Sequence, residues 1–242
     1  MSGVGRVAAP FSITMASSLT TIKNGTEQYG IELIKIPYLS SFIDYQLKAQ
    51  PQSTEWVHDP IPLFDVALKG IQSGYRQCFR SLPPELPQFQ VLCETYDFLC
   101  VDVVSHQSID EIITDLKSCR SDYEREYKRY REVKGDKSRA RDTAFKLLYL
   151  MLLGDFKNDK TDSVKVYNAV LFIVSHSSTF KWRTRKVIRA AYEARFILSS
   201  KQKAQLDKWE KSDAAKLALE DQRDVTTEQE VSDLEIDSDW SD

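Results

Sequence analysis

The strongest constraint on the fold of this chain is the separation of charge between its C-terminal end and the remainder. Residues 210–242 hold twelve Asp and Glu side chains against three Lys and Arg, a net charge of −9. Their few apolar residues cannot bury enough surface to offset the entropy lost on ordering, so this acidic tail is predicted to be disordered. The whole chain carries −3, which leaves +6 on residues 1–209. A basic body of this kind attracts either its own acidic tail or an acidic partner.

The rest of the chain divides into three predicted regions. Residues 1–27 are rich in Ser, Thr, Gly and Ala and are predicted to form a flexible arm. Residues 28–106 mix short helical and strand-like stretches, whereas 107–209 read as longer helices. The predicted fold class is therefore α+β and helix-rich, with an α-helical domain after the first domain and a disordered tail at the end.

Individual elements follow from apolar spacing, capping residues and turn residues. A strand is predicted at 31–36, a short helix from Pro37 to residue 43, and a loop at 51–59. Ser108 with Glu111 forms a capping box that opens a helix. The remaining predicted helices are 65–73, 90–100, 120–137, 139–153, 163–175, 181–197 and 201–219. The 163–175 segment is compatible with a strand, but its apolar residues do not alternate strictly, which favours the helix.

Cysteine usage and segment lengths predict a cytoplasmic or nuclear protein. No signal peptide is apparent, and the apolar run at 144–153 is too short to cross a bilayer, so no membrane partner is expected. The cysteines form no CxxC pair, and the histidines are scattered, so buried free thiols are expected and no metal or cofactor. These residues are Cys78, Cys93, Cys100, Cys119, His58, His106 and His176.

Catalysis is not predicted. The chain has no Gly-rich phosphate loop, no HExxH, no GxSxG and no Asp/His cluster, and it has only eight glycines. No catalytic residue is therefore proposed from the sequence, because no set of side chains fills the roles that catalysis requires.

Three segments in the first folded region resemble a BTB/POZ domain. They are residues 36–43 (IPYLSSFI), 59–71 (DPIPLFDVALKGI) and 89–101 (FQVLCETYDFLCV), in the order and rough spacing of that family. The chain as a whole also resembles fungal proteins that join a BTB-like domain to a helical C-terminal region. The resemblance implies a BTB/POZ-like domain over 28–106.

The resemblance also implies a function. Domains of this family bind proteins, either by self-association through apolar helix faces or by acting as adaptors for a cullin-type scaffold or a transcriptional regulator. The candidate interface is the first helix, with Tyr38, Leu39, Phe42 and Ile43. The alternative is that these four side chains belong to the core, because apolar helical stripes normally face inward.

A second candidate surface is the basic helix at 181–195. Lys181, Arg185 and Arg189 recur every four residues, which places them on one face, with Arg183 and Lys186 beside it. The alternative functional prediction is a nucleic-acid-associated or regulatory factor that binds phosphate or an acidic protein through this face. Two other interpretations stay open: the acidic tail folds back onto this face, or the face is simply solvated.

The acidic tail contains two candidate phosphorylation sites. Thr227 and Ser232 are each followed by acidic residues up to three positions on, the pattern that acidophilic kinases select. Leu234, Ile236 and Trp240 lie among acids and suit a basic-rimmed groove. A purely solubilising tail is the alternative interpretation.

Overall fold

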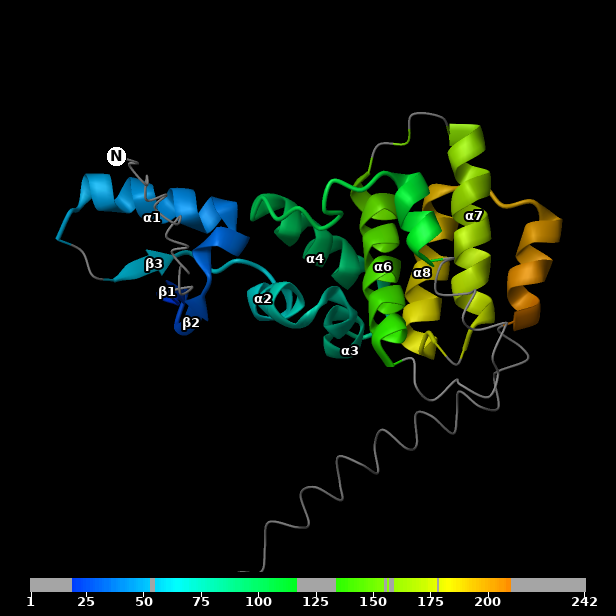
Figure 1. The fold of residues 1–242 in the computed structure, drawn as a ribbon, viewed down its shortest axis with the longest axis horizontal. Coiled ribbons are helices and arrows are strands. Elements are labelled where there is room, and N and C mark those ends of the chain that lie inside the picture. The colour runs from blue at the N-terminus through cyan, green and yellow to red at the C-terminus, as the bar shows by residue number, and fades with distance from the viewer. Residues whose placement is uncertain are drawn as a thin grey trace, which may run out of the picture. The chain divides into compact units, whose positions relative to one another are not determined.

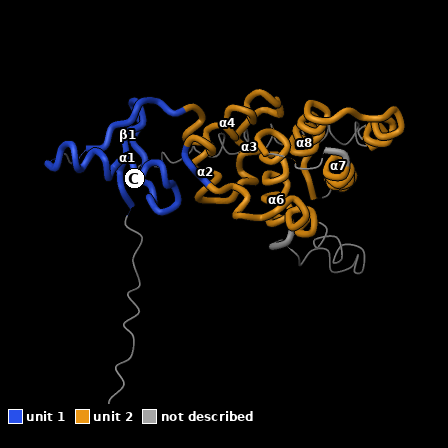
Figure 2. Tube along the Cα trace, turned by 90° about the horizontal axis from the view of Figure 1, so that it is seen from above, with its two compact units in different colours: residues 1–61, 99–101 blue, residues 62–98, 102–242 orange. Residues whose placement is uncertain are grey.

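The computed structural model describes residues 19–52, 55–116, 134–154, 156, 159–177 and 179–209. These residues form a helix-rich structure with one small three-stranded sheet, which confirms the helix-rich α+β class (Figure 1). They divide into two compact units (Figure 2). Unit 1 comprises the described residues up to Ile61 together with Leu99–Val101, and unit 2 comprises Pro62–Phe98 and the described residues from Asp102 onward.

This division differs from the predicted domain boundaries. The predicted boundary near residue 106 placed the helices of 64–98 with the strands, whereas they belong to unit 2 with the later helices. The reason is that apolar residues in 64–98 pack against helices far along the chain, a pairing that local sequence patterns do not report.

Unit 1 is built on a sheet of strand order β2-β1-β3. The strands are β1 (Thr20–Asn24), β2 (Glu27–Ile31) and β3 (Trp56–His58). β1 and β2 are antiparallel and joined by a tight turn in which Gly25 has φ 59°, a conformation that favours glycine. β3 pairs with β1 in parallel.

Three predictions in this unit are wrong. The predicted flexible arm 1–27 contains β1 from Thr20 onward and the start of β2. The strand predicted at 31–36 is replaced by β2, which ends at Ile31, and by the short 3-10 turn η1 (Leu33–Lys35). The loop predicted at 51–59 contains β3. The Asn24-Gly25 dipeptide is a strong hairpin signal that would have located the first two strands.

Helix α1 (Pro37–Ala49) completes unit 1 and runs past the predicted end at residue 43. Proline occupies its first turn, where a missing amide hydrogen is harmless. Leu39 and Ile43 are buried, as are Ile22 and Ile31 of the sheet. The core of unit 1 is thus mainly aliphatic.

The first part of unit 2 holds α2 (Phe64–Ser73), η2 (Tyr75–Gln77), α3 (Cys78–Ser81) and α4 (Leu86–Phe98). α2 ends as predicted at Gly74, whose φ of 95° an L side chain rarely adopts. α4 begins before the predicted residue 90, with Pro87 near its start.

The later part of unit 2 contains α6 (Lys134–Leu153), α7 (Asp159–Ser175) and α8 (Trp182–Arg195), and residues 109–116 and 200–209 are also helical. These elements confirm the predicted helices, including the helical interpretation of 163–175. Residues 120–133 of the predicted helix 120–137, and the continuation of the last helix beyond 209, lie outside the described residues.

The predicted capping box is also confirmed. The backbone and hydroxyl of Ser108 both donate to Glu111 Oε2, at 2.7 and 2.8 Å, and the Glu111 amide donates to Ser108 Oγ at 3.3 Å. These bonds pair backbone groups that the first turn of a helix leaves unsatisfied.

Aromatic rings fill the centre of unit 2. Phe145 of α6 stacks on Tyr75 at a centroid distance of 5.3 Å and meets the edges of Tyr96 and Phe79 at 5.8 and 5.7 Å. Phe145 and Tyr96 have no exposed surface. Because Tyr96 Oη donates to Ala67 O at 3.1 Å, its buried hydroxyl is satisfied.

Among the described residues, no helix combines the length and the apolar character needed to cross a membrane.

Candidate functional site

The aromatic side chains of α1 form the first candidate surface. Tyr38, Phe42 and Tyr45 are spaced three and four residues apart and therefore share one side of the helix. Tyr38 and Phe42 are half-buried, whereas Tyr45 is 69% exposed. We call these three residues the α1 aromatic face.

His58 of β3 holds the α1 aromatic face in place. Its Nε2 lies 2.8 Å from Tyr38 Oη, and its Nδ1 lies 2.7 Å from the carbonyl oxygen of Asp59. The bond to the carbonyl assigns the proton to Nδ1, so the tyrosine hydroxyl donates to Nε2. The Phe42 ring meets the imidazole edge to face at 4.9 Å. His58 thus fixes the orientation of the Tyr38 and Phe42 rings.

The four residues of the predicted interface helix, Tyr38, Leu39, Phe42 and Ile43, differ in exposure. Leu39 and Ile43 are 1% and 5% exposed and belong to the core of unit 1. Tyr38 and Phe42 do reach the surface, and Tyr45, which was not predicted, is the most exposed of the aromatic side chains of α1. The i, i+4, i+7 spacing of these aromatics was the signal that would have identified Tyr45.

The predicted basic face of α8 is wrong in its composition. Arg185 is 7% exposed and belongs to the buried side of the helix. Arg189 is bound by two carboxylates: its Nε donates to Glu193 at 2.8 Å and its Nη2 to Asp207 at 2.5 Å. The guanidinium groups of Arg185 and Arg189 therefore do not form, together with Lys181, the exposed basic face that their four-residue spacing predicted.

The register of α8 explains this error. Val187, Ile188, Ala191 and Tyr192 are all fully buried and set the inward direction of the helix. Arg185 lies three and seven residues from Ile188 and Tyr192, so it shares their side. Centring the helix on these apolar residues would have separated the buried arginine from the solvent-facing cations.

Three cations at the start of α8 remain at the surface and lie beside Trp182 in the sequence or in space. The Arg183 guanidinium lies 6.0 Å and the Lys186 ammonium 5.8 Å from the centre of the indole ring. Lys181, immediately before the helix, is exposed, as is Lys186. Within the described part of the chain, none of these three cations makes an ion pair, in contrast to Arg189. We call these four residues the cation–aromatic surface.

The two buried cysteines, Cys78 and Cys93, provide no reactive site. Burial raises the pKa of the Cys78 thiol to about 12 and also raises that of Cys93, so both are protonated and poorly nucleophilic at neutral pH. Cys78 and Cys93 are buried as predicted, whereas Cys100 is exposed, which corrects that prediction. Cys100 lies just beyond the end of α4, where φ is 55° and its side chain leaves the core.

Two further predictions concern metal binding and modification. The described residues contain no group of three His, Cys, Asp or Glu side chains that could hold a metal ion. Thr227 and Ser232, the candidate phosphorylation sites, and Cys119 lie outside the described residues.

The two surfaces differ in chemistry. The α1 aromatic face offers apolar rings with hydroxyl groups, which suits contact with another protein surface. The cation–aromatic surface offers positive charge around a planar ring, which suits an anionic ligand. Comparison of the chain with known proteins finds no matching family model, and no match among curated proteins or solved structures.

Proposed function

We propose that this chain is a protein-binding module that self-associates through the α1 aromatic face. The observation that carries the proposal is the 69% exposure of Tyr45 beside two rings already oriented by His58. Tyrosine is enriched at protein interfaces because its ring buries a large area while few rotatable bonds are frozen.

Other exposed apolar side chains of unit 1 support the same proposal. Ile34 is 88% exposed and Val57 54%. Scattered apolar residues are ordinary on a surface, but their concentration in so small a unit is typical of a binding region.

The BTB/POZ resemblance agrees with a protein-binding role but does not carry the proposal. Its first segment lies in unit 1, its second passes from unit 1 into unit 2, and most of its third belongs to unit 2. The proposal therefore depends on the exposed side chains of α1.

Light scattering of the full chain over a concentration series, at low and high salt, tests the proposal. We expect a dimer or larger species that high salt does not dissociate, because apolar contacts are insensitive to ionic screening. Tyr45→Ser should shift the equilibrium toward monomer by at least about tenfold, since a central tyrosine contributes about 2 kcal/mol or more at an interface.

Leu47→Ser is the matched control, because Leu47 is exposed on the same helix but lies outside the aromatic face. It should leave the mass unchanged. A strict monomer at all concentrations, or equal effects of both variants, would reject self-association through this face.

A second candidate function is nucleic-acid binding by the cation–aromatic surface. A tryptophan flanked by Arg183 and Lys186 can stack on a base while the cations contact phosphates. Fluorescence anisotropy with a single-stranded oligonucleotide tests it. Binding should weaken steeply with salt and be reduced by Lys186→Gln, and salt-independent or absent binding would reject it.

A further inference from the structure

We propose that the cation–aromatic surface of α8 is a docking site for the chain's own acidic tail, residues 210–242. The contact is intramolecular and electrostatic. It would cover Lys181, Trp182, Arg183 and Lys186 and leave the α1 aromatic face untouched, so it does not depend on the proposed self-association.

No carboxylate of the described residues forms an ion pair with the cations of this surface. Lys181 and Lys186 are exposed, and Arg183 and Lys186 flank the Trp182 ring at 6.0 and 5.8 Å. The first turn of α8 contains no acidic residue. An anionic segment is the ligand that such a surface favours.

Arg189, on the same helix, is a cation that is already paired with carboxylates. Its side chain is 13% exposed and is held by Glu193 and by Asp207 of the helical segment 200–209. An acidic residue from the C-terminal part of the chain therefore already pairs with α8, about one turn from Lys186 and about two turns from Lys181.

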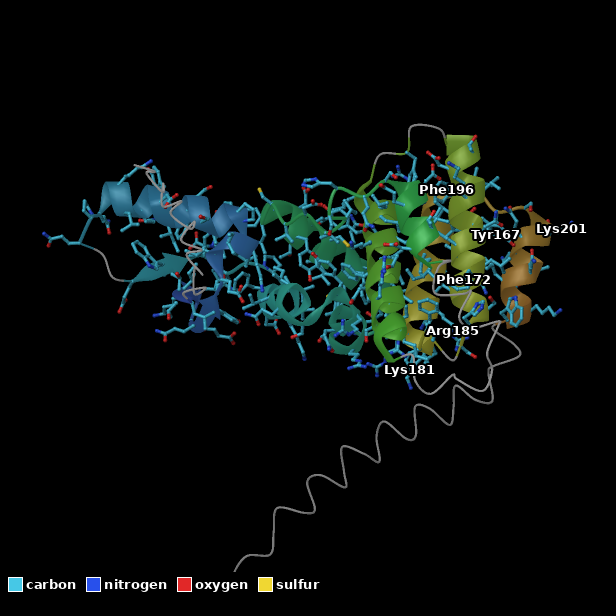
Figure 3. All side chains as sticks on the ribbon, in the orientation of Figure 1. Tyr167, Phe172, Lys181, Arg185, Phe196 and Lys201 are labelled. Carbon is cyan, nitrogen blue, oxygen red and sulfur yellow. The ribbon has the colours of Figure 1, made fainter. Side chains whose placement is uncertain are left out.

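The starting point of the tail is fixed by the packing of residues 200–209. Leu206 is fully buried, Tyr167 Oη of α7 lies 2.9 Å from Gln205 Oε1, and Asp207 pairs with Arg189. In Figure 3, Lys181 lies near one end of α8, and Phe196 and Lys201 lie toward the other. Residues 200–209 therefore run back toward the end of α8 that carries Lys181.

The tail is long enough to reach this surface. Lys181 precedes Arg189 by eight residues, a distance of about 12 Å along a helix. The tail has 33 residues, and a random coil of that length has a root-mean-square span of about 30 Å. A tether of that length holds its acidic groups at an effective concentration on the order of 1 mM.

Charge complementarity selects the tail as the occupant. It carries −9 within one segment, whereas the rest of the chain carries +6. Because the tail is covalently attached, a nucleic acid or an acidic protein would have to displace it to reach the same cations. The cation–aromatic surface is thus occupied in the free chain and opened by competition.

Carbodiimide cross-linking of the full chain tests this contact, because the reagent joins lysine amines only to carboxylates that touch them. An equal mixture of unlabelled and ¹⁵N-labelled protein is cross-linked and digested with trypsin, which releases residues 224–242 as one peptide. We expect this peptide joined to Lys181 or Lys186, with both partners carrying the same isotope, and a loss of these products at high salt.

Internal and variant controls make the test specific. Lys201, Lys203 and Lys208 are exposed and closer to the tail in sequence, so they report proximity without docking. Arg183→Gln should lower the yield at Lys181 and Lys186 about two- to fivefold, the effect of one exposed charge pair. Arg80→Gln, a matched change on α3, should leave the yield unchanged.

Several results would overturn the proposal. Cross-links that reach only Lys201, Lys203 and Lys208 would show proximity without docking. Cross-linked products that combine a labelled and an unlabelled peptide would show contact between two chains. Equal yields from Arg183→Gln and Arg80→Gln would show that Arg183 does not contribute. An oligonucleotide that binds the cation–aromatic surface without reducing the cross-links would also reject competition for one site.

Discussion

The two units of this protein use their aromatic side chains in opposite ways. In unit 1, the described aromatic residues all retain solvent contact, and the fully buried core consists of aliphatic residues such as Ile22, Ile36 and Leu39. In unit 2, Phe89, Tyr96, Phe145, Phe180 and Tyr192 are all below 2% exposed. Aromatic rings therefore stabilise the fold of unit 2, whereas in unit 1 they lie at the surface.

This difference has a physical origin. A buried ring contributes a large apolar area and specific edge contacts, which unit 2 uses around Phe145. An exposed ring gains that free energy only when a partner covers it.

The strongest test is Phe145→Ala in unit 2. Loss of a fully buried ring that contacts Tyr75, Phe79 and Tyr96 should reduce the free energy of unfolding by about 3–5 kcal/mol. Urea unfolding followed by circular dichroism measures this. Phe98→Ala is the control, because Phe98 is 46% exposed and its loss should cost less than about 1 kcal/mol. Similar costs for both would contradict an aromatic core.

Leu39→Ala makes the corresponding test in unit 1. Leu39 is 1% exposed, and its truncation should cost about 2–5 kcal/mol. Hydrogen exchange should show the loss of protection in β1 and β2. Leu47→Ala on the same helix, 42% exposed, should leave that protection unchanged. If Leu39→Ala were as mild as Leu47→Ala, the assignment of Leu39 to the core would be wrong.

Gly70→Ala probes how tightly the aromatic core approaches the backbone of α2. An added Cβ would lie 2.9 Å from Cys78 Sγ and would also collide with the Tyr96 hydroxyl, so overpacking should cost about 1–3 kcal/mol. The cost should shrink in a Tyr96→Phe background, because one colliding atom is absent. Gly30→Ala, where nothing lies within 4 Å, is the control in unit 1. A cost that Tyr96→Phe does not relieve would place the clash elsewhere.

The smallest predicted effect concerns the last described helical segment. Ser199 Oγ accepts from the Gln202 amide at 3.3 Å, and Gln202 Oε1 accepts from the Ser199 amide at 2.9 Å, which forms a second capping box. Ser199→Ala should lower the local stability of residues 200–209 by about 0.5–2 kcal/mol, measured by hydrogen exchange. Ser200→Ala should have little effect, and equal losses from both would argue against the cap.

Features that depend on neighbours a few residues apart could be predicted from the sequence. The apolar spacing of α7, the end of α2 at Gly74 and the Ser108–Glu111 capping box were all predictable because each rests on contacts within one or two turns. The same local rules contained signals that were overlooked, namely the Asn24-Gly25 turn and the apolar stripe of α8.

Only the tertiary structure decided which of the locally similar side chains are accessible. The pairing of β3 with β1 joins residues more than thirty positions apart. Arg189 is held by Asp207 from the following helix, and the helices of 64–98 pack within unit 2 rather than with the strands. Periodicity places a residue on a side of its helix, but it does not state what lies against that side. Packing by distant segments therefore buries Leu39 but leaves Tyr45 of the same helix exposed. In α8 it buries Arg185 but leaves Lys186 exposed.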